Sequence, residues 1–262
     1  MKRAFNRVAD FFDTVLVRNP INSWMHEVNL GVLASTFPAG SCLLEIGCGT
    51  GTAAIDLAHR GFRVFGFDVS SSMVTKALQK VAAEGMQGRI RIVEGRGRDV
   101  LRVASQSPWG TFDGAYSNFA LTYEEDLRGF GHALSKLIRP GAFFVCTLPN
   151  RVVLSEAAIY CPQGRFERVL RRLETPLKIE VEGSLLEIRA YSPWQVRELF
   201  RDSFDLTAVV GVPTFLPPVY LHAQYAKLGG GQRLLKGLDS RFAMRYPWNR
   251  FGEHTLFKFR RK

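Results

Sequence analysis

The stretch Leu43-Leu44-Glu45-Ile46-Gly47-Cys48-Gly49-Thr50-Gly51 joins an apolar run, an acidic residue and three glycines spaced two apart. Glycine permits a sharp turn from a strand into a helix, and its missing Cβ lets a ligand lie directly on the backbone. The helix-forming residues that follow, 53–58, complete the order strand, glycine loop, helix. This order predicts a nucleoside-binding site in an α/β fold.

The spacing of the loop separates two kinds of ligand. A dinucleotide fingerprint, G-x-G-x-x-G/A, counted from Gly47 needs glycine or alanine at position 52, where this chain has Thr52. Glu45, just before the turn, would repel a pyrophosphate but would suit a ligand that carries an ammonium and a sulfonium. The loop therefore disfavours a nicotinamide-dependent oxidoreductase and predicts a cationic ligand.

A second apolar run, residues 63–68, ends in the carboxylate of Asp68, 17 residues after Gly51. That spacing is close to the one at which an acid accepts hydrogen bonds from ribose hydroxyls. With these residues the chain resembles the class I S-adenosylmethionine-dependent methyltransferases, whose first motif is E/D-x-G-x-G-x-G and whose second strand ends in the ribose acid. The resemblance implies S-adenosylmethionine as cofactor, methyl transfer as reaction and a Rossmann-like fold.

The end of the third strand departs from the family. The family usually has G-D-A here, with the Asp accepting a hydrogen bond from the adenine amino group, but this chain has Arg96 in that place, followed by Gly97. Because arginine cannot accept a hydrogen bond, adenine must be recognised by backbone groups, by Gly97 or by Asp99.

Residues 112–121 resemble the family's fourth motif, in which a polar residue at the carboxyl end of the strand faces the reacting methyl group. Open α/β sheets bind ligands beyond these strand ends, so we expect Asn118 and Phe119 to line the cofactor and Tyr123 to lie just beyond. The expected cofactor-binding residues are Glu45, Gly47, Cys48, Gly49, Gly51, Asp68, Val69, Met73, Arg96, Gly97, Asn118 and Phe119.

The expected architecture is a single α/β domain with a Rossmann-like, seven-stranded, mostly parallel sheet and helices on both faces. A helical cap (1–40) precedes the cofactor-binding core (41–150), and insertions follow at 151–190 and 213–253. Periodicity and capping residues predict helices in 5–37, after Ser70 and after Ser192, and an amphipathic basic helix at 165–173. They also predict strands at 142–148, 204–212 and 254–259, the first of them after a turn at Pro140-Gly141. A hairpin is predicted to turn at Glu182-Gly183-Ser184.

In this fold class the substrate is usually recognised by such insertions, so we expect Tyr220 and His222, together with Tyr123, to contact the methyl acceptor. Transfer from a sulfonium is an in-line displacement of an activated leaving group, and the protein mainly has to align the reactants. No catalytic base is assigned, and the candidates that stay open are His222, His26, His254, Tyr123, Tyr220 and Glu253.

The formal net charge is +11, and residues 151–262 hold 19 Lys and Arg against 11 Asp and Glu. Such a balance suits a nucleic acid, an anionic membrane or an acidic substrate, or only a soluble surface. Enzymes that methylate base amines commonly show N/D-P-P-Y/F/W after strand four, whereas residues 117–120 contain no proline. We therefore expect a small-molecule acceptor, lipid-like or aromatic, with RNA methylation and non-catalytic cofactor binding as alternatives.

Helix 165–173 is the candidate for peripheral contact with an anionic membrane.

The chain has no apolar run long enough to span a bilayer and no signal peptide pattern, which predicts a cytoplasmic protein. The four cysteines show no metal-binding spacing and predict buried thiols and no metal site. The oligomeric state is left open.

Overall fold

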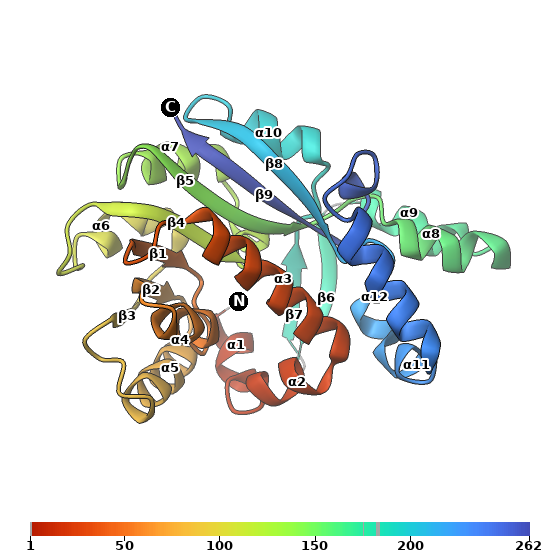
Figure 1. Cartoon of the computed structure of the whole chain (residues 1–262), viewed down its shortest axis with the longest axis horizontal. Helices are drawn as coiled ribbons and strands as arrows, with labels where there is room; N and C mark the ends of the chain where they lie inside the picture. The colour runs from red at the N-terminus through yellow and green to blue at the C-terminus, as the bar shows by residue number, and fades with distance from the viewer. Residues whose placement is uncertain (1, 175, 182–183) are drawn as a thin grey trace.

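The computed structural model describes residues 2–174, 176–181 and 184–262. Within these residues seven strands form one sheet, which confirms the expected mostly parallel Rossmann-like fold (Figure 1). The strands, in spatial order, are β3 (Ile90–Glu94), β2 (Arg63–Asp68), β1 (Cys42–Ile46), β4 (Phe112–Asn118), β5 (Ile138–Pro149), β9 (His254–Arg261) and β8 (Phe204–Val212). The pairs from β3 to β5 are parallel, and β9 runs antiparallel to both β5 and β8.

Helices cover both faces of the sheet because successive strand residues point to opposite sides. In β1, Leu43 belongs to one buried cluster and Leu44 to the other. The first cluster is covered by α3 (Pro20–Thr36), α4 (Thr52–His59) and α5 (Ser71–Ala83), and the second by α6 (Val100–Ala104), α7 (Leu127–Ser135) and α10 (Pro193–Phe200).

Capping residues start the helices where the sequence indicates. The Ser70 hydroxyl accepts from the Met73 amide at 3.2 Å, and Ser192 forms a capping box with Gln195. The turn predicted at Pro140-Gly141 is a bulge within β5: the strand runs through it, but Gly141 has a φ of 75° and the register against β4 shifts there.

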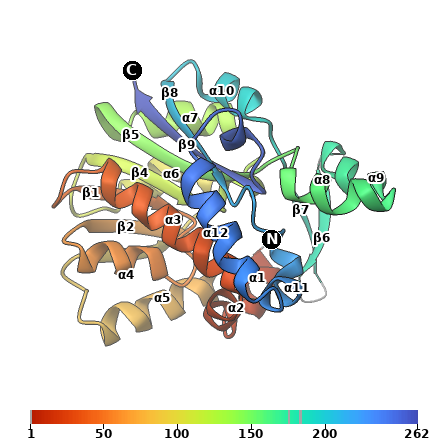
Figure 2. The same cartoon turned by 45° about the vertical axis from the view of Figure 1, so that its right-hand side comes forward.

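The N-terminal segment is helical, as expected for 5–37. It consists of α1 (Lys2–Val8), α2 (Phe12–Arg18) and α3, with Asn19 capping α3 through hydrogen bonds from two backbone amides. The views in Figures 1 and 2 place α1 and α2 beyond the carboxyl ends of the central strands. No helix of the described chain is long and apolar enough to cross a membrane.

Two groups of elements follow β5 and β8. Residues 151–190 form α8 (Leu154–Tyr160), η3 (Cys161–Gln163), α9 (Phe166–Leu170), η4 (Arg171–Leu173) and the antiparallel pair β6 (Leu177–Val181) and β7 (Ser184–Ile188). Residues 213–253 form η5 (Val219–Leu221), α11 (His222–Ala226), α12 (Gly230–Phe242) and η6 (Trp248–Arg250), with α12 beside α3 (Figure 2). Residues 182 and 183 of the predicted hairpin turn lie outside the described residues.

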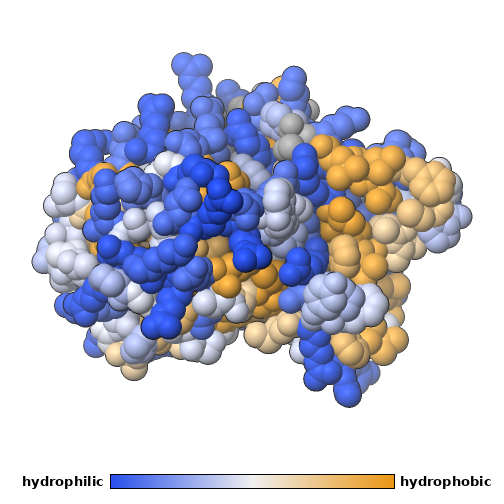
Figure 3. Space-filling model, turned by 90° about the horizontal axis from the view of Figure 1, so that it is seen from above, coloured by the Kyte–Doolittle hydropathy of each residue, from blue (hydrophilic) through white to orange (hydrophobic). Residues whose placement is uncertain are grey.

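The segment 165–173 differs from a single amphipathic helix. It is a five-residue helix followed by a 3₁₀ turn, Phe166 is 57% exposed, and Arg172 is buried. Apolar residues gather on the surface at this end of the molecule, where Figure 1 places α8 and α9 (Figure 3). The apolar stripe therefore faces solvent, and one of the arginines points inward.

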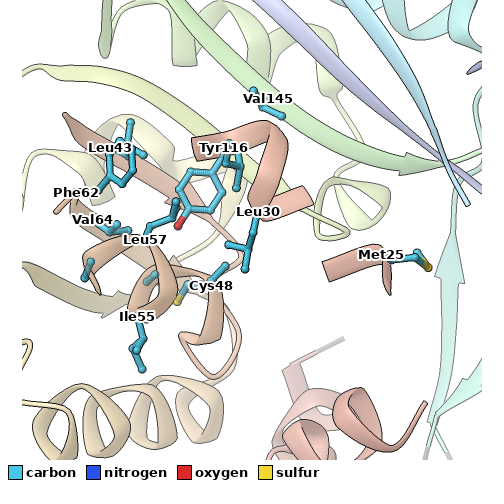
Figure 4. Close-up of a cluster of buried hydrophobic side chains, with 14 of the residues drawn as sticks. Met25, Leu30, Leu43, Cys48, Ile55, Leu57, Phe62, Val64, Tyr116 and Val145 are labelled. Carbon is cyan, nitrogen blue, oxygen red and sulfur yellow. The ribbon is translucent and has the colours of Figure 1, made fainter. Parts of the chain in front are cut away.

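Glu45 is the buried carboxyl of β1. Glu45 is two residues from Leu43 in β1 and so points to the same side of the sheet, where Leu43 packs with Tyr116 and Cys48 (Figure 4). Its Oε2 has no hydrogen-bond partner among the described residues. Burial, with a smaller contribution from the nearby Asp68 charge, raises the pKa of Glu45 to about 8, although the Tyr116 side chain opposes that rise. Glu45 is therefore protonated at neutral pH in this state of the protein.

This pKa predicts how stability depends on pH. The unfolded chain ionises Glu45 near 4.5 and the folded chain near 8, so the wild type loses stability as pH rises from about 5 to about 8. Glu45→Gln keeps the neutral shape and lacks the titration. We expect urea unfolding between pH 5 and pH 8 to show the variant gaining stability relative to wild type as pH rises, and parallel profiles would contradict a buried neutral Glu45.

Candidate functional site

A cavity of about 380 Å³ lies at the carboxyl ends of β1, β2, β3 and β4. Many of the residues expected from the sequence line it: Gly47, Gly49, Asp68, Val69, Met73, Arg96, Gly97, Asn118, Phe119 and Tyr123. The parallel strands bring these residues together because their carboxyl ends share one edge of the sheet.

Three of the expected cofactor residues lie behind the loop and do not line the cavity. The Cys48 side chain is buried against Gly66 of β2, and Glu45 lies beneath the loop. Gly51 is the N-cap of α4 with a φ of 77°, and a Cβ there would lie 3.1 Å from the Ala77 side chain. Their positions support the loop from below.

The glycine loop is held against the ends of β2 and β4. The amides of Gly47 and Cys48 both donate to the Phe67 carbonyl, at 2.9 and 3.0 Å. Gly47 has a φ of 72°, and a Cβ at this position would overlap the side chain of Ala120. Only glycine allows both this backbone conformation and this close approach.

Asp68 is placed where β2 meets the loop. Its Oδ2 accepts from the Gly49 amide and its Oδ1 from the Ser70 amide, both at 2.9 Å. Burial raises the pKa of Asp68, and these backbone hydrogen bonds counteract that rise. The carboxylate is thus oriented by the backbone, with lone pairs left for a ligand in the cavity.

Polar contacts fasten the N-terminal helices over the loop. The Asn6 side chain on α1 accepts from the Ser70 hydroxyl at 2.7 Å. On α2, Asp13 accepts from the Thr50 hydroxyl at 2.5 Å and from Lys80 at 2.9 Å. These contacts bring Phe5 and Phe12 into the cavity wall, two lining residues that the sequence did not identify.

The end of β4 supplies an acceptor and a strained residue. The Asn118 Oδ1 is buried and has no hydrogen-bond partner among the described residues. Phe119 has a φ of 61°, which is rare for a residue with a side chain. Its ring meets the His254 ring edge-on at 5.0 Å, so Phe119 separates His254 from the cavity. Burial lowers the pKa of His254 to about 3.

Near Arg96 the cavity contains a carboxylate that the sequence did not indicate. Glu124 lines the cavity, and its Oε2 lies so close to Gly97 that a Cβ there would overlap it. Burial raises the pKa of Glu124. Asp99 does not line the cavity and lies 3.8 Å from Arg102. The sequence could not show that Glu124 lies beside Gly97, because Glu124 follows β4 and Gly97 follows β3, and the two meet only when the sheet forms.

Tyr220 does not line the cavity: it is 42% exposed and contacts a buried ionic cluster of Glu156, Arg172 and Glu253. Its hydroxyl donates to Glu156 at 3.1 Å, and Arg172 donates to Glu156 at 3.0 Å and to Glu253 at 3.4 Å. Burial raises the pKa of Glu253 to about 7, while Arg172 opposes that rise. The cluster joins the two insertions, since its members come from both 151–190 and 213–253.

His222 is exposed, with its Nδ1 3.2 Å from the Val219 carbonyl, and does not line the cavity. His26 lies 2.9 Å from Asp56, also outside it. No histidine of the described chain lines the cavity. Within the described residues, no group of three or more His, Cys, Asp or Glu side chains is arranged to hold a metal ion.

Comparisons with known proteins agree with this geometry. Residues 43–141 match the methyltransferase domain family. A S-adenosyl-L-methionine-dependent Diels-Alderase of a Neonectria species is 24% identical over 71% of this chain and 65% of its own length. An O-methyltransferase of Aspergillus sclerotiorum is 30% identical over 40% of this chain and 38% of its own length. The matched regions thus span only part of these relatives.

Among solved structures, a methyltransferase from Thermotoga maritima, described as a possible histamine N-methyltransferase, superposes with a TM-score of 0.61 at 15% identity and full coverage of both chains. At this identity the likeness is one of fold. Residues 43–141 match the methyltransferase domain family, and the chain as a whole therefore has the Rossmann-like fold of S-adenosylmethionine-dependent methyltransferases.

Proposed function

We propose that the chain binds S-adenosylmethionine in the cavity at the carboxyl ends of β1 to β4 and transfers its methyl group to a small-molecule acceptor. The observation that carries the proposal is the convergence of the glycine loop, Asp68 and Asn118 on one cavity under the N-terminal helices. The acceptor class, lipid-like or aromatic, follows from the apolar walls described below.

The groups in the cavity match the cofactor's polar parts. Asp68 offers free lone pairs at the carboxyl end of β2, where they would accept hydrogen bonds from ribose hydroxyls. The unpartnered Asn118 Oδ1 is an acceptor for the ammonium group. Gly47 and Gly49 expose the loop backbone to the cavity, where a ligand would lie.

Glu124 is our candidate for recognition of the adenine amino group. It is a carboxylate beside Gly97, on the side of the cavity where the family uses an Asp and this chain has Arg96. A half-buried carboxylate accepts hydrogen bonds from an amino group strongly. Glu124 would therefore replace the missing acid from a neighbouring strand end.

When bound, S-adenosylmethionine supplies a methyl group on an activated leaving group, so the protein's task is alignment and exclusion of water. Phe5 and Phe12 close the cavity from above, and Leu121 and Tyr123 continue the apolar wall. Phe5 and Tyr123 pack edge-to-face at 5.3 Å. Such walls favour an apolar or aromatic acceptor over a charged one.

No base is needed for an acceptor that loses no proton before attack. Burial raises the pKa of Tyr123 to about 12, which makes its phenolate a rare species at neutral pH. An acceptor that is already nucleophilic therefore needs no base here, and for any other acceptor the lining carboxylates Glu124 and Glu125 are the candidate bases.

A cyclisation is the second candidate, because one relative is named as a S-adenosyl-L-methionine-dependent Diels-Alderase. A cycloaddition needs the reactants held in one shape and leaves the cofactor unchanged. The fate of the cofactor therefore distinguishes the two reactions.

The first test incubates the purified chain with a cell extract and cofactor carrying a labelled methyl group. Methyl transfer predicts a labelled small molecule and an equal amount of S-adenosylhomocysteine, both measured by mass spectrometry. A changed metabolite without S-adenosylhomocysteine would support cyclisation. Label in RNA alone, or binding without any product, would replace the proposal by RNA methylation or by non-catalytic binding.

The second test concerns Asp68. Asp68→Ala removes the ribose acceptor, and the loss of two charge-assisted hydrogen bonds of about 1.5 kcal/mol each lowers affinity for S-adenosylhomocysteine about a hundredfold. The control is Asp202→Ala, an exposed acid that does not line the cavity. Calorimetry measures both, circular dichroism checks that the variant is folded, and unchanged affinity would refute the ribose role.

The third test compares S-adenosylhomocysteine with S-inosylhomocysteine, which carries an oxygen in place of the adenine amino group. We expect wild type to prefer the adenine ligand by at least about tenfold, since one charge-assisted hydrogen bond is at stake. Glu124→Ala should lose this preference, and Glu125→Ala, which changes another lining carboxylate, should keep it. An unaltered preference in Glu124→Ala would exclude the adenine role.

A further inference from the structure

The surface formed by residues 206–252 is cationic. This segment contains six Lys and Arg residues and a single acid, Asp239. Asp239 is buried, and its carboxylate accepts hydrogen bonds from the amides of Thr214, Phe215 and Leu216 at 2.7 to 3.1 Å. The one carboxylate is thus turned into the fold, and the exposed charges of the segment are all positive.

Apolar and basic side chains share the outward face of α12. Leu234 and Arg241 lie two helical turns apart on α12 and so project from the same side of it. Leu234 is 65% exposed, and Arg241 is exposed. Arg245 is exposed just beyond the end of the helix, and its guanidinium and that of Arg241 both lie over the Phe242 ring, at 5.8 and 5.9 Å. Met244, also 65% exposed, follows directly after the helix.

The flanking turns extend this surface. Leu228 precedes α12, and Tyr246 and Trp248 follow it, with Tyr246 76% exposed. The Arg250 guanidinium lies over the Tyr246 ring at 5.5 Å. Aromatic rings beside cations and exposed aliphatic chains are typical of surfaces that rest in the headgroup region of a bilayer.

The segment 165–173, which the sequence suggested for membrane contact, is less suited. Arg165 lies 3.8 Å from Glu167, and Arg172 is buried against Glu156. Its positive charges are therefore partly neutralised or turned inward, unlike those of 206–252.

The cationic surface lies at the end of the molecule that carries the cavity's cap. Figures 1 and 2 both place α11 and α12 near α1 and α2, and Phe5 and Phe12 of α1 and α2 line the cavity. A bilayer against α12 would therefore lie next to the helices that cover the cofactor site.

We propose that the face formed by Leu228, Leu234, Arg241, Met244, Arg245 and Trp248, the α12 face, docks on an anionic lipid bilayer. The exposed aliphatic chains enter the acyl boundary, and the arginines bind lipid phosphates. Self-association through this face would oppose like charges, and a nucleic acid would leave the leucines and the methionine without an apolar partner. Docking on the bilayer is independent of the proposed function. Only the further step, in which the bilayer delivers a lipid-like acceptor to the cavity, rests on it.

The test is flotation of the full chain with vesicles of phosphatidylcholine alone and of phosphatidylcholine with phosphatidylglycerol. Wild type should float only with the anionic vesicles and be released by high salt. Leu234→Glu/Met244→Glu should lower the bound fraction at least about tenfold, because two charges replace the inserted apolar chains.

The matched control is Leu78→Glu/Leu101→Glu. Both leucines are exposed, on α5 and α6, away from α12 in Figure 1, and the change in net charge is the same. This variant should float nearly as wild type does. Calorimetric binding of S-adenosylhomocysteine by both double variants shows that they are folded.

Failure of wild type to float, or equal losses in both variants, would overturn the α12 face as a membrane site. Binding of labelled RNA without binding to vesicles would overturn it in favour of a nucleic acid. A dimer in light scattering that Leu234→Glu/Met244→Glu dissociates would overturn it in favour of a second copy of the chain. Because methyl transfer is measured without vesicles, loss of docking with retained transfer rejects only this inference, and docking without transfer rejects only the proposed function.

Discussion

The close packing of the glycine loop against the ends of β2 and β4 is the constraint on which the site depends. A Cβ at Gly47 would overlap Ala120, and the Phe67 carbonyl holds two successive loop amides. Because Asp68 also binds the Gly49 amide, the loop and the ribose acid form one rigid unit. Every other part of the cavity is positioned relative to this unit.

The N-terminal helices extend the same unit into a closed site. Asp13 and Asn6 bind residues of the loop region and of the start of α5, and they carry the phenyl rings of Phe5 and Phe12 into the wall. Side-chain hydrogen bonds, including one with an ammonium, and a small apolar cluster of Val8, Ala9 and Met73 hold this cap on the core.

The insertions have two separate roles. The buried cluster of Glu156, Arg172 and Glu253 joins them, so that Tyr220 serves their packing and lies away from the cavity. The outward side of α12 is positively charged, because the only acid of this helix, Asp239, is buried and accepts hydrogen bonds from backbone amides. The aromatic and polar residues of the insertion 213–253 look alike in sequence. In the structure some of them are buried in the core, some join the ionic cluster and some lie on the surface.

The sequence by itself determined the elements whose cause is local. The glycine spacing, the acid ending β2 and the caps at Ser70 and Ser192 predicted the loop, the sheet class and the helix starts, because each depends on residues a few positions apart. Only the tertiary structure decided that Glu45 is buried and neutral, that Glu124 lies beside Gly97, that Phe5 and Phe12 face the cavity, and that the stripe at 166–173 faces solvent. These properties arise where segments far apart in the chain meet, and neither burial nor such proximity is encoded in the spacing of neighbouring residues.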